Sequence, residues 1–241
     1  MKLGILSDIH GNREALEVVL ADVAAQGVQA IGCLGDFVGY GASPNDCIGI
    51  LRAIVEVAVL GNHDVAALGR LKLGGFQSDA ATTARWTMDQ LEPDHRAWLE
   101  ALPYTAQWRG VRLVHATPSE PEDWHYVLSI ADAEIEFHAF RERIGFIGHS
   151  HVPGVFETDG AQITYTRASS VPLRSGLRYL VNVGSVGQPR DGDPRAAWML
   201  YDEEGDTLEH RRVAYDVERS GTRIREAGLP LFLAERLKWG E

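Results

Sequence analysis

The segment Leu3-Gly4-Ile5-Leu6-Ser7-Asp8-Ile9-His10 decides the fold, because a short apolar run ends abruptly at a carboxylate and an imidazole. A run of this length that stops at polar residues is typical of a buried strand. Residues 14–26 follow with apolar side chains at helical spacing. The order of strand, polar turn and helix predicts the first unit of an α/β fold.

The same pattern recurs along the first half of the chain. Further apolar runs predict strands at 30–34, 57–60, 111–114 and 144–147, and each one stops at Asp, Asn or His. Helices are predicted after Ser43-Pro44, which resembles an N-cap followed by proline, and at about 79–90, 93–101 and 131–142. Ligands bind at the carboxyl ends of strands in open α/β sheets, so five polar endings predict one shared site.

The second half of the chain changes character. Residues 162–167, 179–183, 196–201 and 208–213 read as strands separated by Gly- and Asp-rich turns, and a last helix is predicted near 229–238. The sequence contains no internal repeat, low-complexity tract or linker. We therefore expect a single domain over residues 1–241.

Composition restricts the class of partner. The formal net charge of −11 argues against long nucleic acid, whose binding depends on Lys and Arg neutralising phosphates. A small phosphorylated ligand remains compatible if metal cations offset the local charge. No apolar run approaches the ~18 residues of a membrane span, and the N-terminal run is too short for a signal peptide. We expect a cytoplasmic protein without membrane contact. Cys33 and Cys47 are expected to be buried free thiols. The sequence does not indicate an oligomeric state.

The residues that follow the strands form a metal-ligand set. Asp8 and His10 are two positions apart and would share one face of an extended segment, as would His149 and His151. Carboxylates, imidazoles and an amide oxygen suit a divalent first-row metal, and the absence of Cys disfavours a closed structural zinc site. The set exceeds the needs of one tetrahedral ion and suits two metals that share a carboxylate. Its members are Asp8, His10, Asp36, Asn62, His115, His149 and His151.

Taken together, the motifs resemble a known family. Asp8-x-His10, Gly35-Asp36, Gly61-Asn62-His63-Asp64, His115 and Gly148-x-x-His151 resemble the calcineurin-like metallophosphoesterases, and residues 182–190 resemble the small bacterial phosphodiesterase-type branch. The resemblance implies an α/β fold, a four-layer α-β-β-α sandwich of two mixed sheets with helices on both outer faces. It also implies that Asp8, His10 and His151 bind one metal, that Asn62, His115 and His149 bind a second, and that Asp36 bridges them.

The resemblance further implies catalytic roles within the third motif. His63 would face the substrate as proton donor or charge stabiliser, and Asp64 would orient His63; the alternative for Asp64 is a cap of the following helix. Two cations ~3.5–4 Å apart can clamp the attacking and leaving oxygens while a metal-bridging hydroxide attacks in line. Mn²⁺, Zn²⁺ or Fe is expected, with Ni²⁺ or Co²⁺ also compatible, because availability and geometry decide occupancy.

Three further groups of residues are candidates for substrate contact. Arg190, in the turn-rich loop 187–193, would lie near the pocket mouth and could bind a phosphate oxygen, or be a salt-bridged surface residue. Asn12 and Arg13 could reach phosphate or simply begin a helix. Aromatic side chains could stack on a leaving group or serve as loop packing; these are Tyr40, Trp124 and Tyr126.

The leading interpretation is a dinuclear-metal-dependent hydrolase of small phosphodiesters. A phosphomonoesterase or nucleotidase is the nearest alternative, and the acidic chain speaks against a nuclease. The protein Ser/Thr phosphatases of the family carry an arginine after the second motif, which is missing after Gly35-Asp36, and they have Glu where this chain has Asp64. A non-catalytic interaction scaffold would be expected to lose ligands or the catalytic histidine, but every position is filled here.

Overall fold

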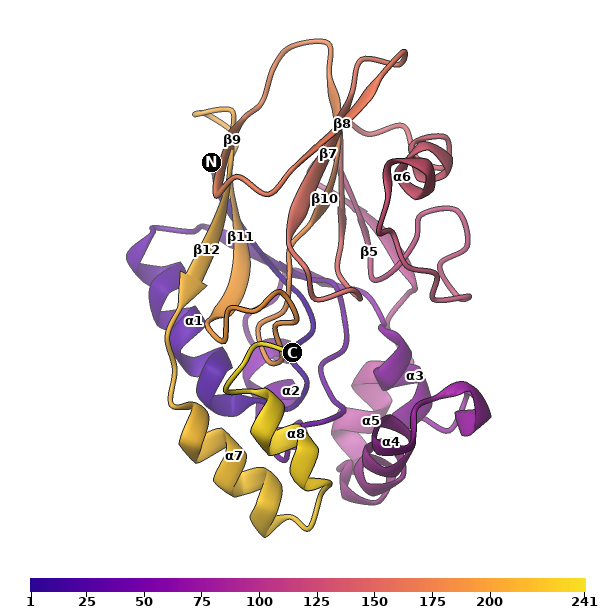
Figure 1. Cartoon of the computed structure of the whole chain (residues 1–241), viewed down its shortest axis with the longest axis vertical. Helices are drawn as coiled ribbons and strands as arrows, with labels where there is room; N and C mark the ends of the chain where they lie inside the picture. The colour runs from indigo at the N-terminus through magenta and orange to yellow at the C-terminus, as the bar shows by residue number, and fades with distance from the viewer.

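The computed structural model describes residues 1–241 and contains two six-stranded sheets packed face to face. In Figure 1 the sheets stand side by side, with helix α1 (Arg13–Ala25) outside the first sheet and helix α6 (Ile130–Phe137) outside the second. Two mixed sheets with helices on both outer faces are the predicted α-β-β-α sandwich, so the expected fold class is confirmed.

The first sheet has the strand order β3-β2-β1-β11-β12-β9. Its three N-terminal strands are parallel, and the other three join antiparallel. The strands are β1 (Lys2–Leu6), β2 (Ala30–Cys33), β3 (Val57–Ala58), β9 (Ser170–Pro172), β11 (Ala196–Asp202) and β12 (Thr207–Val213).

The second sheet has the order β4-β5-β6-β10-β7-β8. Its central strands β5, β6 and β10 are parallel, and antiparallel strands flank them on both sides. The strands are β4 (Thr105–Trp108), β5 (Val111–Val114), β6 (Ile144–Ile147), β7 (Gly154–Thr158), β8 (Ile163–Thr166) and β10 (Arg178–Asn182).

The remaining helices gather at one end of the sandwich, the lower end in Figure 1. No helix has the combination of length and apolar character that crossing a bilayer requires. These helices are α2 (Pro44–Arg52), α3 (Asn62–Ala67), α4 (Ser78–Gln90), α5 (Pro93–Glu100), α7 (Val217–Glu226) and α8 (Leu231–Arg236), with a 3-10 turn at Leu73–Gly75.

The main core lies between the two sheets. Leu3 and Ile5 of β1 are fully buried there and share a cluster with Phe146 of β6 and Val181 of β10. On the other face of the first sheet, Leu6 belongs to a second cluster under α1 and α2. Burial on both faces explains why the central strands read as continuous apolar runs rather than as alternating patterns.

Several predicted elements need correction. The helix predicted at 131–142 ends at Phe137. The guanidinium of Arg178 donates to the carbonyl of Phe137 at 2.8 Å, so this carbonyl does not accept from a further helical turn. The strand predicted at 57–60 is shorter, since the amide of Leu60 donates to the carbonyl of Pro103. Ser43 precedes α2 as predicted, but its side chain makes no capping hydrogen bond. The elements that the sequence did not predict are β4, β7, β9, α3 and α7.

Candidate metal centre

The site forms where strand ends of the two sheets meet. Asp8 lies just beyond β1 and Asp36 just beyond β2, while His115 directly follows β5 and His149 lies just beyond β6. Backbone hydrogen bonds join these turns. The amide of Asp8 donates to the carbonyl of Gly35 at 3.0 Å, and the amide of Gly148 donates to the carbonyl of His115 at 2.8 Å. The parallel central strands therefore bring residues from distant parts of the chain to one edge.

The turns hold the ligand candidates in an uncommon backbone conformation. Asp8, His10, Asp36, His149 and His151 all have positive φ, between 50° and 64°. Residues other than glycine seldom adopt this left-handed region, and it persists only where the surrounding structure enforces it. The shared conformation aims five side chains into a small volume between the sheets.

Two glycines allow backbone amides to reach the carboxylates. A Cβ at Gly61 would collide with Oδ1 of Asp36, and one at Gly148 would collide with the hydroxyl of Ser7. With glycine in both places, the amide of His149 donates to Oδ2 of Asp8 at 3.1 Å. The glycines of the two motifs are therefore required by close packing around the carboxylates.

Each carboxylate has one oxygen fixed by the protein and one directed at the histidines. Oδ2 of Asp8 accepts from Ser7 Oγ at 2.6 Å, whereas its Oδ1 makes no hydrogen bond and lies 3.1 Å from Nε2 of His151. Oδ1 of Asp36 accepts from the amide of His63 at 2.8 Å, and its Oδ2 lies 3.4 Å from Nε2 of His115. Both carboxylates are buried.

Three histidines present Nε2 to the centre. Their Nδ1 atoms lie at hydrogen-bond distance from backbone carbonyls: His10 from Val38 at 3.0 Å, His115 from Leu34 at 2.9 Å, and His151 from Gln188 at 2.5 Å. A carbonyl can only accept, so Nδ1 carries the proton and the neutral ring keeps its lone pair on Nε2. Such a backbone partner is the usual support of a metal-binding histidine.

The ligand atoms fall into overlapping groups that fit cation binding. Potential ligand atoms of Asp8, His10 and His151 lie within 4.8 Å of one another, as do those of Asp8, Asp36 and His115. The first group contains the three residues expected at one metal.

Asn62 and His149 complete the set in a different way. Oδ1 of Asn62 and Nε2 of His115 are buried without a hydrogen-bond partner, which is costly unless a cation satisfies them. His149 has its Nε2 3.0 Å from the carbonyl of Trp124, so its Nδ1 is the free ring nitrogen, and its ring centroid lies 5.1 Å from that of His115. The residues present therefore fit divalent metal.

The electrostatics agree with a site for cations. Although burial opposes ionisation, the charges of His151 and His115 hold the pKa of Asp8 well below its usual range. Burial lowers the pKa of His149 to about 4 and that of His151 to about 3. For His115, burial is outweighed by Asp36 and Asp8, which raise its pKa to about 9. Ionised carboxylates and imidazoles are ligands that first-row divalent metals accept, once His115 has given up its second ring proton.

His63 lies beside the ligands, and Asp64 does not orient it. The His63 ring is 4.9 Å from that of His10 and 4.4 Å from that of Tyr40, and its Nδ1 has no hydrogen-bond partner. Asp64 instead accepts from the amides of Asp36 at 2.8 Å and Gly61 at 3.0 Å. Asp64 thus caps α3 and joins two motif loops, which is the alternative considered for it.

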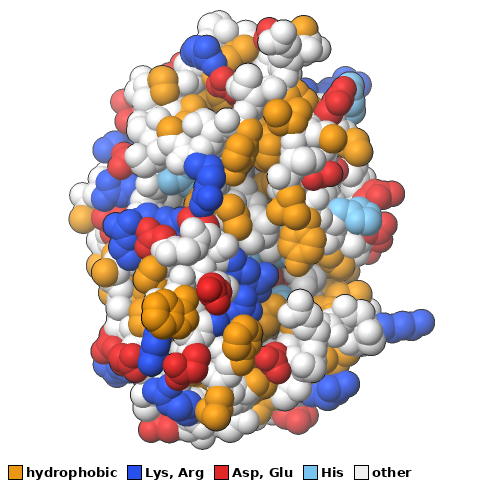
Figure 2. All heavy atoms as spheres, in the orientation of Figure 1, with side chains coloured by type: hydrophobic (Ala, Val, Ile, Leu, Met, Phe, Trp, Pro, Cys, Tyr) orange, Lys and Arg blue, Asp and Glu red, His pale blue; other side chains and the backbone are white.

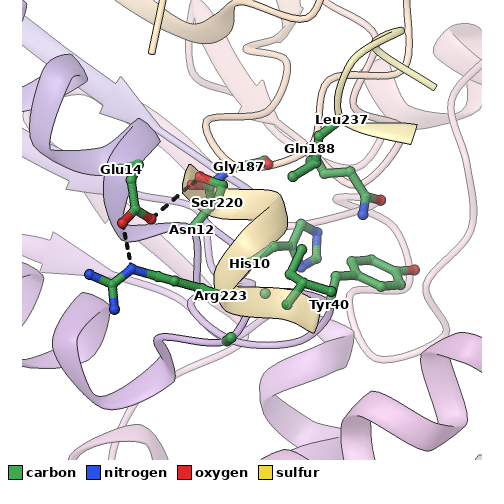
Figure 3. A pocket seen from close by; sticks show the side chains of 13 residues that line it. His10, Asn12, Glu14, Tyr40, Gly187, Gln188, Ser220, Arg223 and Leu237 are labelled. Atoms are coloured by element: carbon green, nitrogen blue, oxygen red, sulfur yellow. Dashed lines mark hydrogen bonds and ion pairs between the residues drawn. The ribbon is translucent and has the colours of Figure 1, made fainter. Parts of the chain in front are cut away.

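Asn12 also takes the helix-start role. Its Oδ1 accepts from the amide of Ala15 at 3.1 Å and from the hydroxyl of Ser220 at 2.8 Å, and its Nδ2 donates to the carbonyl of Gly187 at 2.8 Å. Figure 3 shows Asn12 beside Ser220, at the junction of α1 and α7. Its side chain is engaged in holding this junction, and a role in substrate contact stays a prediction. Arg13 pairs with Glu17 at 2.6 Å on the surface.

A cleft of about 510 Å³ opens onto the centre. Arg190 lines it and forms no ion pair, its guanidinium lying 5.5 Å above the Tyr40 ring, so the salt-bridged alternative is not observed. Tyr126 stacks on His149 with centroids 4.2 Å apart. Sequence reasoning missed the lining residues that belong to no motif, among them Lys72, Phe76, Asp79, Asp123, Phe232 and Arg236.

Comparisons with known proteins show which family the chain resembles. The sequence profile of the calcineurin-like phosphoesterase superfamily domain matches residues 1–205. An uncharacterized protein of Methanocaldococcus jannaschii is 36% identical over 99% of this chain and 98% of its own length.

Two solved structures are similar over the whole chain. The crystal structure of a metallophosphoesterase from Sphaerobacter thermophilus is 38% identical, with a TM-score of 0.89 over 100% of this chain and 99% of that one. A hypothetical protein from Pyrococcus horikoshii shares the fold at 18% identity, with a TM-score of 0.79 over 100% and 98% of the two chains. The strand-end ligands, the matched domain and these relatives lead to one conclusion: the chain belongs to the calcineurin-like phosphoesterase superfamily.

Proposed function

We propose that the protein hydrolyses small phosphodiesters at this centre with two divalent metal ions. The observation that carries the proposal is the convergence of two buried carboxylates with three imidazoles whose Nε2 atoms face them, at the floor of an open cleft. Asp8, His10 and His151 would hold one ion, Asn62, His115 and His149 the other, and Asp36 both. Mn²⁺, Zn²⁺ and Fe are the expected ions.

The metals and the side chains have separate tasks. Bound divalent cations supply charge that screens the phosphate and lower the pKa of water. Asp8 and Asp36 stay ionised and hold this charge in place. The backbone carbonyls behind His10, His115 and His151 keep the imidazoles in the tautomer that offers Nε2.

His63 would assist the leaving group. Its amide is fixed to Asp36, and its ring lies between those of Tyr40 at 4.4 Å and Phe76 at 5.4 Å, which restricts its orientation without a carboxylate partner. The ring lines the cleft and would give a proton or positive character to the departing oxygen.

The cleft bears on the choice between diester and monoester. A phosphodiester has two organic substituents, and the cleft has space and aromatic walls for both, including Trp124, Tyr126 and Phe232. The basic residues Lys72 and Arg190 in the same cleft favour a second candidate function, the hydrolysis of phosphomonoesters, because positive charge suits the phosphomonoester dianion. A scaffold role is disfavoured because every ligand position and His63 are filled.

The experiment compares initial hydrolysis rates of bis-p-nitrophenyl phosphate and p-nitrophenyl phosphate by metal-stripped protein reloaded with Mn²⁺. Faster, metal-dependent turnover of the diester supports the proposal, whereas faster turnover of the monoester selects the phosphatase. Asp36→Asn should abolish either activity. The matched control is Asp46→Asn, an exposed carboxylate on α2 that pairs with Arg13, and it should keep full activity. Metal-bound protein that is inactive on both esters would favour the scaffold role.

A further inference from the structure

Two arginines line the same cleft without an ion pair to an acidic side chain. Arg190 belongs to the loop that follows β10, and Arg236 is the last residue of α8. Nη2 of Arg190 donates to Oε1 of Gln188 at 2.9 Å, while its Nε is buried without an acceptor. Arg236 donates from Nε to the backbone oxygen of Glu241, and neither arginine forms an ion pair with an acidic side chain.

The arginines of the neighbouring β12 and α7 are neutralised. Arg223 pairs with Glu14, and Arg211 pairs with Asp22 at 3.0 Å. The chain has a net charge of −11, so acidic partners are plentiful. Figure 2 shows basic side chains gathered at the centre of the face, next to hydrophobic ones and above the C-terminal helices. Unlike the arginines of β12 and α7, Arg190 and Arg236 are not paired with an acidic side chain.

The packing of α8 holds Arg236 in this position. Leu233 and Leu237 are buried in a small cluster, and Tyr40 packs against that cluster. The Tyr40 ring is also close to both His63 and Arg190. Its centroid lies 4.4 Å from that of the His63 ring and 5.5 Å from the guanidinium of Arg190. Burial and then the charge of Arg190 lower the pKa of Arg236, as expected when like charges are held close together. An anion between the two arginines would relieve this repulsion.

We propose that Arg190 and Arg236 form a subsite for a second phosphate, carried by the leaving group of the substrate. This inference rests on the proposed function, because Tyr40 places Arg190 on the side of His63, where the leaving group departs. A guanidinium suits phosphate because its planar fork can donate two parallel hydrogen bonds. The substrate class is then a small phosphodiester whose alcohol leaving group is itself phosphorylated, such as a 5′-phosphorylated dinucleotide.

The subsite combines the family domain with the C-terminal helices. Arg190 lies within residues 1–205, which match the superfamily domain, whereas Arg236 lies beyond them. Helix α7 docks α8 to the body of the protein, since Ser220 of α7 donates to Asn12 and Arg223 pairs with Glu14. In Figure 3, dashed lines join Glu14 to Ser220 and to Arg223. The C-terminal helices thus add substrate selectivity to a shared metal centre.

The test uses a matched pair of substrates, thymidylyl-thymidine with and without a 5′-phosphate, and Mn²⁺-loaded protein. The wild type should prefer the phosphorylated dinucleotide by about 10- to 100-fold in kcat/KM, the contribution of charge-assisted hydrogen bonds. Arg236→Gln should reduce this preference to near one. The control is Lys238→Gln, two residues further on, which pairs with Glu218 and Glu235 and should keep the preference.

The outcomes separate the subsite from the proposed function. Equal rates on the two dinucleotides, with bis-p-nitrophenyl phosphate still hydrolysed, overturn the subsite alone. Absence of any diester hydrolysis overturns the proposed function, and calorimetry with inorganic pyrophosphate on metal-free protein then tests the subsite. Arg236→Gln should weaken pyrophosphate binding at least about tenfold, and equal affinity overturns the subsite. If Arg236→Gln fails to fold by circular dichroism, Arg236→Lys replaces it and should show an intermediate preference.

Discussion

Nε2 of His10 lies 3.1 Å from Nε2 of His151, although 141 residues separate the two histidines. Both rings place Nδ1 against a backbone carbonyl, so in their neutral forms two lone pairs face each other. Such a contact is unfavourable unless a cation or a proton lies between the nitrogens. The fold therefore holds these side chains in an arrangement that favours metal.

Metal should consequently stabilise the protein. At a free concentration 100 times its dissociation constant, a ligand adds about 2.7 kcal/mol, which raises the melting temperature of a chain of this size by about 5–10 °C. The measurement is thermal unfolding in Mn²⁺ and in chelator. An exposed group of Glu120, Asp123 and His125 is a possible alternative site, so His125→Ala serves as control. If His125→Ala lost the metal-dependent rise in melting temperature, the stabilising metal would bind the exposed group and not the buried centre.

Metal binding should also release protons near pH 8. Asp36 and Asp8 outweigh burial and raise the pKa of His115 to about 9 in the metal-free protein, so the ring is largely protonated at pH 8. A ligand must give up that proton, and the affinity for metal should therefore rise between pH 7 and pH 9. Calorimetry in two buffers of different ionisation enthalpy measures the release.

The same pKa affects stability without metal. The pKa of His115 in the folded protein lies above its value of about 6.5 in the unfolded chain. Protonation of His115 therefore contributes fully to the free energy of unfolding below about pH 6.5, and this contribution is lost as the pH rises through about 9. Metal-free protein with His115→Gln should lack this part of the pH dependence. Identical profiles for both proteins, together with no proton release, would contradict the assigned protonation state.

His63→Ala should separate chemistry from metal binding. We expect full metal content and turnover lowered by ~10²–10⁴, the usual contribution of general acid–base catalysis. A leaving group that needs no proton should show a smaller loss, because the assistance is then less important. Metal analysis and rates on esters of graded leaving-group pKa measure the two effects. A variant that lost its metal would instead identify His63 as a ligand.

The sequence predicted the strand ends better than their surroundings. Asp8, Asp36 and His115 each follow a buried apolar run, and burial on both faces makes such runs easy to recognise. The role of Asp64 was harder to predict, since a carboxylate next to His63 can bond either to the ring or to nearby amides. Its three amide partners include Val38, and their positions depend on how two loops pack.

Arg236 shows a second limit of sequence reasoning. It lies in a charged C-terminal segment with no motif, close in sequence to the arginine-containing stretch 219–225. In the structure this stretch lies in α7, whose Ile224 packs with Leu233 of α8 while Arg223 pairs with Glu14. Only the tertiary packing of the two helices brings Arg236 to the cleft.

Gly61→Ala should empty the metal centre while the fold persists. Gly61 has φ of −103°, which alanine adopts without strain, so its backbone conformation is not the reason for glycine here. The added methyl group would collide with Oδ1 of Asp36 and lie 2.5 Å from the amide nitrogen of that residue, which must displace the carboxylate. Metal analysis should show reduced occupancy, with circular dichroism close to that of the wild type.

The matched control is Gly74→Ala, because a Cβ at Gly74 meets no atom within 4 Å. This variant should keep its metal and its activity, so that any general effect of replacing glycine is measured separately. Equal metal content in the two variants would mean that Asp36 can shift without loss of the ions. The close contact between Gly61 and Asp36 would then serve the packing of the loops rather than the geometry of the centre.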